Sequence, residues 1–151
     1  MEFAIILPVM LLMTLGLIDL GRAFVFGVAV QEGTRQAARI AATASYDSSV
    51  TDSAVLGRLV GASNPALNGC ASLTTLQSCN GGNWTFTVNV SSGGSSYPSI
   101  AAARTAHALP GSQVTITAAG SVALLPGLNT GIFGLSLPQI NVQGRSAMVI
   151  L

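Results

Sequence analysis

The chain has 151 residues, which is enough for about one domain together with a membrane anchor. Half of its residues are hydrophobic, only 7% are charged, all six basic residues are arginines, and the net charge is +1. This balance excludes an electrostatic nucleic-acid surface, because neutralising phosphates requires several grouped lysines or arginines.

The first 30 residues are apolar enough to cross a membrane. Residues 3–18 contain one polar side chain, Thr14, and the apolar stretch extends to Val30 if the charges of Asp19 and Arg22 are tolerated. That length, about 28 residues, exceeds the roughly 20 that a helix needs to span a bilayer. A secretory signal peptide would be shorter and would begin with basic residues, so we expect the segment to be retained as a membrane helix.

The helical pattern continues beyond the apolar segment. Glu32 and Arg35 are three residues apart, which makes them neighbours on one helix face, and an alanine-rich strip follows them. A helix ending near residue 45 would be about 65 Å long, roughly twice the thickness of the hydrocarbon layer. We therefore divide the chain into a transmembrane helix at 1–45 and an extracytoplasmic head at 46–151.

The head is predicted to be mixed in secondary structure. Residues 51–63 show helical spacing, with Thr51 or Asp52 as the N-cap. Residues 83–92 alternate between apolar and polar side chains, and 112–124 and 140–151 are further strand candidates. We expect a loop at 93–99, a helical turn at 100–108 and a Gly/Pro-rich loop at 125–139. The fold class is therefore α+β: a long hydrophobic helix and a small antiparallel sheet, with the outer end of the helix covering one sheet face.

The two cysteines, Cys70 and Cys79, are separated by eight residues in a stretch flanked by glycine and asparagine. A disulfide closing a small loop is the natural interpretation for a domain outside the cytoplasm, and two reduced thiols are the alternative.

Two charges interrupt the apolar helix. A lone charge in the middle of a membrane helix costs a few kcal/mol, so such residues normally pair or face a protein interior. Asp19 and Arg22 are three residues apart and can pair with each other, or they can face neighbouring subunits in a helical bundle. Glu2 suits the positive end of the helix dipole, and it could equally meet the α-amine of a neighbour.

Small and irregular residues in the same helix favour packing against other helices. Glycines permit close helix approach and are otherwise costly, while an early proline loosens one turn. The residues predicted to contribute to helix–helix assembly are Glu2, Phe3, Pro8, Gly16, Asp19, Gly21, Arg22 and Gly27.

Residues for chemistry are scarce. His107 is the only histidine, two cysteines cannot form a closed zinc site, and a phosphate loop of the Walker type requires a lysine. We expect no enzyme, no metal, no cofactor and no small-molecule substrate. Asn83 and Asn89 begin Asn-X-Thr and Asn-X-Ser triplets, which match the N-glycosylation pattern.

The N-terminal pattern resembles that of TadE-like proteins, pseudopilin-type components of tight-adherence (Tad/Flp) pili. The resemblance runs over residues 2–45 and again over 113–151, where a strand, a Leu-Leu-Pro-Gly-Leu loop and a final strand are similar to the family. The matching N-terminal positions are Glu2, Phe3, Ala4, Pro8, Asp19, Gly21, Arg22, Ala37, Ala38, Arg39 and Ala41.

The resemblance implies a structural role. It implies synthesis as an inner-membrane precursor, trimming by a prepilin-type peptidase, contact with the pilus assembly machinery and packing of the helix with identical helices in an extracellular filament. The expected function is that of a self-assembling pilus subunit for adhesion or surface attachment. The alternatives are a minor, priming pseudopilin of a pilus or secretion machine, and a monomeric single-pass membrane protein that carries a binding head.

Overall fold

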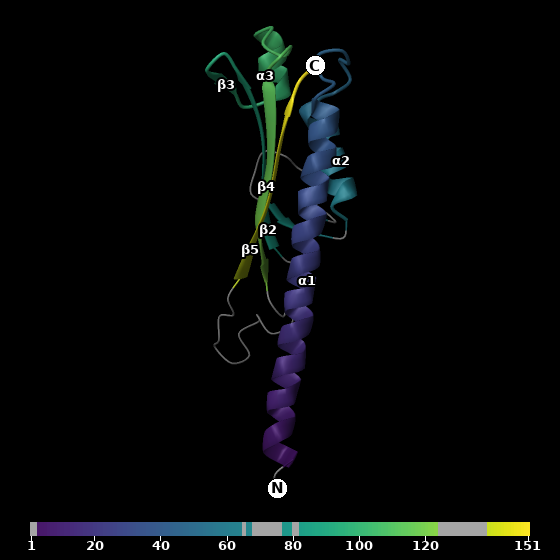
Figure 1. Ribbon diagram of the computed structural model, residues 1–151, viewed down its shortest axis with the longest axis vertical. Helices are drawn as coiled ribbons and strands as arrows, with labels where there is room; N and C mark the ends of the chain where they lie inside the picture. Colours follow the sequence, from purple (N-terminus) through teal and green to yellow (C-terminus); the bar gives the residue numbers. More distant parts are fainter. Residues whose placement is uncertain (1–2, 65, 68–76, 80–81, 124–138) are drawn as a thin grey trace.

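A computed structural model describes residues 3–64, 66–67, 77–79, 82–123 and 139–151, and it has the predicted α+β fold (Figure 1). One long helix extends well beyond a small sheet that packs along its C-terminal half. The helices are α1 (Phe3–Ala41), α2 (Asp52–Ala62) and α3 (Ile100–Thr105). The strands are β1 (Gln77–Cys79), β2 (Gly82–Ser92), β3 (Ser95–Tyr97), β4 (Gln113–Ala123) and β5 (Gln139–Val149).

Helix α1 ends at Ala41, a few residues before the predicted end near residue 45. The chain then tightens into turns, in which the amides of Thr43 and Ala44 donate to carbonyls three residues earlier. The carbonyls released there bind other parts of the head: Ala42 O accepts from the amide of Leu151, and Ala44 O accepts from the Arg104 guanidinium. Tertiary hydrogen bonds therefore replace the last helical turn.

The sheet is antiparallel, in the order β1-β2-β4-β5, with β3 also paired to β2. The three predicted strands form β2, β4 and β5, and the register aligns Phe86 with Ala118 and Ala118 with Gly144. Strands β1 and β3 were not predicted. Each has only three residues, too few for an alternating pattern, and pairs with one end of β2. Gly93 and Gly94, both with positive φ, turn the chain from β2 into β3 within the predicted loop.

One face of the sheet forms the core with α1 and α2. Trp84, Phe86, Val88 and Val90 are buried on β2, as the alternation predicted, and Val114 and Ile116 continue this face on β4. The stripe of α1 that packs against the head repeats every three or four residues. Its buried members are Ala23, Phe26, Val30, Thr34, Ala37, Ala38 and Ala41.

Three glycines let these elements approach closely. A Cβ at Gly33 would meet the side chain of Ser63 and lie 2.8 Å from Leu59 O, so α2 could not pack as closely on α1. A Cβ at Gly144 would lie 2.9 Å from Val30 O, where α1 crosses β5. At Gly120, the indole of Trp84 occupies the space that a side chain would need.

Arg104 holds together the turn that follows α1. Its Nη2 donates to the carbonyls of Ala44 and Val50 (both 3.0 Å) and of Asp47 (3.3 Å). Hydrogen bonds from the side chain and backbone of Ser49, together with the charge of Arg104, lower the pKa of the Asp47 carboxyl from its ordinary 3.8. Because the pKa is lower when folded, this stabilisation is present above about pH 4 and is lost as the pH falls through the folded pKa.

The first prediction compares two glycines in helices. Gly33→Ala should lower the free energy of unfolding by about 1–3 kcal/mol, because the new methyl group meets the backbone and side chains of α2. The matched variant Gly61→Ala meets nothing within 4 Å and should be stabilising by about 0.5–1 kcal/mol through helix propensity. Thermal unfolding of the full chain in detergent, followed by circular dichroism, measures both. Equal shifts of the same sign would contradict the packing role of Gly33.

The second prediction concerns His107, which has a φ of 53° and follows Ala106, the C-cap of α3. Its amide donates to Arg104 O and the amide of Ala108 donates to Ala103 O, the two bonds of a Schellman cap. Because a left-handed backbone is costly for a residue with a Cβ, His107→Gly should be stabilising by about 1 kcal/mol and raise Tm by about 2–4 °C. The control Ala106→Gly, at a φ of −82°, should lower Tm. A lower Tm for His107→Gly would contradict this interpretation.

Candidate assembly surface

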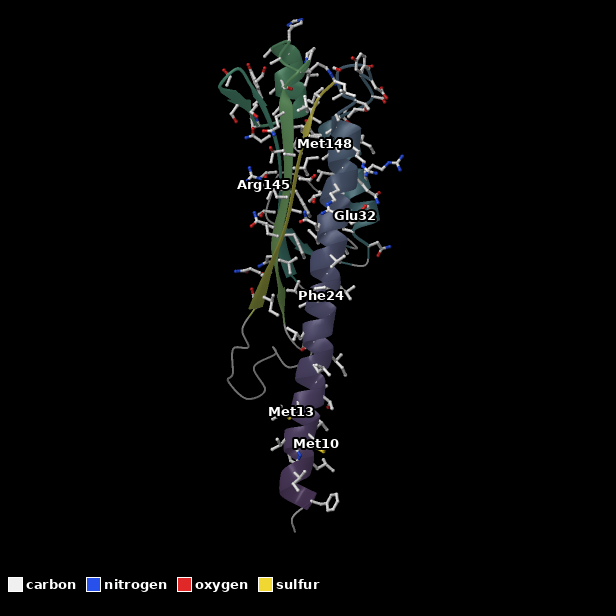
Figure 2. The ribbon with its side chains drawn as sticks, in the orientation of Figure 1. Met10, Met13, Phe24, Glu32, Arg145 and Met148 are labelled. Carbon is white, nitrogen blue, oxygen red and sulfur yellow. The ribbon has the colours of Figure 1, made fainter. Side chains whose placement is uncertain are left out.

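The N-terminal half of α1 exposes apolar side chains in every direction. Between Ile6 and Leu20, every side chain except those of Leu15 and Asp19 is exposed. Met10 and Met13 lie on the part of the helix that extends past the sheet (Figure 2). By length and composition, α1 from Ile6 to Ala41 could cross a membrane: its mean hydropathy is 1.9, and 17% of the apolar window is buried. An apolar surface of this extent requires lipid or other protein around it.

Asp19 lies on the side of α1 that carries the head. It is four residues before Ala23 and seven before Phe26, so it continues the stripe that packs against the head, and it is only 8% exposed. Arg22 is half-buried, and its guanidinium lies 5.2 Å from the centre of the Phe26 ring, a cation–π distance. The chain itself therefore already covers the carboxylate that was predicted to meet either its own arginine or a neighbouring subunit.

The structure describes all but one of the other residues predicted for helix–helix assembly, and these lie on α1. Phe3 is exposed, Pro8 is inside the helix, and Glu2 lies outside the described residues. A Cβ at Gly16, Gly21 or Gly27 would meet nothing within 4 Å. These three glycines differ from Gly33 in this respect, because packing within the described part of the chain does not require them.

A groove lies on α1 where the apolar surface gives way to charge. It has a volume of about 410 Å³ and is lined by Phe24, Gly27, Val28, Gln31, Glu32 and Arg35. Phe24 is 73% exposed and Val28 is 55% exposed. Beyond them, Arg35 Nη1 lies 3.9 Å from Glu32 Oε2, the ion pair that the spacing predicted as a neighbour contact.

The outer face of the sheet is polar and nearly uncharged. Asn83 and Asn89, the two residues in glycosylation triplets, are both exposed on this face of β2. Asn89 Oδ1 accepts a hydrogen bond from Ser96 Oγ at 2.9 Å. The register places Arg145 of β5 in the same row as Thr87 and Thr117 (Figure 2). Modification of either asparagine remains a prediction.

The cysteine pairing also remains a prediction. Cys79 is the last residue of β1, and Cys70 lies outside the described residues. Within the ranges that the structure describes, no three His, Cys, Asp or Glu side chains come close enough to hold a metal ion.

Sequence reasoning missed the two residues that join α1 to the head most directly. Gln31 Nε2 donates to the carbonyl of Arg145 on β5 at 3.3 Å, and Arg104 binds the carbonyls after α1. Neither has a local signal, because each partner is more than 50 residues away in the chain. The one indirect signal was their polarity: Gln31 is a polar side chain next to an apolar segment, and Arg104 is one of only six basic residues.

The comparisons with known proteins concern the same helix. The family model described as TadE-like protein matches residues 1–39, and no curated protein and no solved structure matches the chain. The match indicates a component associated with Tad pili, whose N-terminal apolar helix suggests membrane anchoring. The similarity drawn above for residues 113–151 lies outside the match and stays a prediction. Over its N-terminal helix, the chain is thus similar to the TadE-like proteins, which confirms the resemblance seen in its sequence.

Proposed function

We propose that this chain is a structural subunit of an extracellular pilus-like filament and that it assembles with copies of itself through α1. The observation that carries the proposal is the exposed, apolar N-terminal half of a helix whose other half is fixed to a folded head. No catalytic role is included, since the family match points to a structural, pilus-associated protein.

The length of the exposed helix supports a passage through the membrane before assembly. From Phe3 to Arg22 the helix has about 20 residues, or about 30 Å, which equals the thickness of the hydrocarbon layer. Lipid can therefore surround most of this part, on the sides that the head does not cover near Asp19. On leaving the membrane, the same surface would be exposed to water unless sister helices cover it.

The attachment of α1 to the head supports a filament with the heads on the outside. The helix has no break between its exposed part and the stripe that packs against the sheet, and Gly33 and Gly144 hold it close to α2 and β5. Bundled α1 helices would therefore carry their heads in fixed orientations around the bundle. Trimming by a prepilin-type peptidase and contact with the assembly machinery belong to this proposal through the family match.

The third prediction is that shearing releases the chain from cells in sedimentable filaments. Immunoblots of the sheared pellet, with an inner-membrane protein as the contamination control, measure the fraction assembled. A major subunit should dominate the filament mass, whereas a priming pseudopilin should be present in few copies and be required for any filament to form. A chain found only as a monomer in the membrane would refute the proposal and favour a single-pass anchored protein.

The fourth prediction concerns the charges at residues 19 and 22. We propose that Asp19 acts within its own chain, because it already faces the head and is 8% exposed there. Asp19→Arg and Arg22→Asp should each reduce filament incorporation at least tenfold, because each reverses a charge at the edge of the head, and partial recovery in the double exchange would show that the two charges act on each other.

Co-expression of the two single variants distinguishes the alternatives. If the charges act within one chain, a mixture of the two single variants should not assemble. If they act between subunits, as the sequence also allowed, the mixture should assemble about as well as the double variant. Normal assembly of each single variant alone would remove both charges from the assembly mechanism.

A further inference from the structure

The groove on α1 is apolar on one side and charged on the other. Phe24 and Val28 form the apolar wall, and Gly27 leaves the base open, with nothing within 4 Å of where its Cβ would be. Glu32 and Arg35 bound the groove at the other end and balance each other's charge. Such a site suits an uncharged apolar side chain better than an ion.

This groove lies on a part of α1 that lipid does not easily cover. Gly27 is 24 residues beyond Phe3, or about 36 Å along the helix, whereas the hydrocarbon layer is about 30 Å thick. The head does not cover it either, since Phe24 and Val28 are 73% and 55% exposed. Moving the helix about 6 Å deeper would bring Gly27 to the edge of the hydrocarbon, but it would also draw in the part of the head that covers Ala23 and Phe26.

A second copy of α1 offers the matching surface. Its residues from Phe3 to Ile18 are uncharged and carry large exposed side chains, such as Phe3 and Met13. The rest of α1 is a poorer match, since charges recur at Asp19, Arg22, Glu32, Arg35 and Arg39. The neutral groove and the neutral N-terminal half of the same helix are therefore complementary.

We propose that the groove around Gly27 binds a large apolar side chain from residues 3–18 of a second copy, in a parallel and axially staggered pair of helices. This inference rests on the proposed function and adds the face of α1 and the stagger used in assembly. Bringing residues 3–18 of one helix to residue 27 of the other requires an offset of 9–24 residues, or about 14–36 Å along the axis.

Photo-crosslinking of the full chain tests the contact directly. The photoreactive amino acid p-benzoylphenylalanine replaces Phe24, an aromatic for an aromatic, and crosslinked dimers are analysed by mass spectrometry of their peptides. Crosslinks to residues 3–18 of a second copy are expected. Crosslinks only to lipid, to residues 46–151 or to a different protein would overturn the inference, in whichever fraction the chain is found. Absence of the chain from filaments would instead overturn the proposed function.

The fifth prediction tests the groove in a second way, by filling it with a larger side chain. Gly27→Leu should reduce filament incorporation at least tenfold without lowering Tm or membrane insertion, because its Cβ has open space around it and the side chain extends into the open groove. Gly57→Leu on α2 is the matched control: it is also a helical glycine with open space at its Cβ, and its incorporation should stay within twofold of the unmodified chain. Equal incorporation of both variants would overturn the use of this groove.

Discussion

The close packing of α1 against β5 and α2 is the interaction on which the rest of the structure depends. It gives one continuous helix two halves that differ in exposure: residues from Ala23 onward contribute a buried stripe to the head, while most of the earlier ones expose apolar side chains. The contact needs two glycines, because a methyl group at Gly33 or Gly144 would meet backbone oxygens within 3 Å. Because α1 packs so closely on β5 and α2, the direction in which its exposed N-terminal half extends is fixed.

The glycines of α1 fall into two groups according to whether another element packs beside them. Gly33 is explained by the fold, since α2 fills the space beside it. Gly16, Gly21 and Gly27 have open space beside them, although glycine inside a helix costs up to about 1 kcal/mol relative to alanine. A helix that must approach sister helices would account for that cost, and this agrees with a family match confined to residues 1–39. The head shares its core with the C-terminal half of this helix.

The chain has few charged side chains, and several of them have a distinct structural role. Arg104 satisfies carbonyls in the turn after α1, and Glu32 and Arg35 neutralise each other where the exposed face of the helix turns polar. Asp19 is buried at the end of the stripe that faces the head, so a carboxylate that looks misplaced in a membrane helix has a protected position within its own chain. The polar outer face of the sheet is then left almost free of charge, with Arg145 in its middle rows.

The sequence by itself determined the long helix, the α+β class, the three main strands and the buried face of β2, because hydrophobic periodicity is a local property that neighbouring residues set. It also indicated a resemblance to TadE-like proteins over residues 2–45, which the family match over residues 1–39 confirms. Only the tertiary structure decided that α1 ends at Ala41, that β1 and β3 pair with the ends of β2, and that Asp19 faces the head while the Gly27 groove faces outward. The physical reason is that these features depend on contacts between residues far apart in the chain: carbonyls bound by Arg104, short strands templated by a long one, and a helix face chosen by the sheet that covers it.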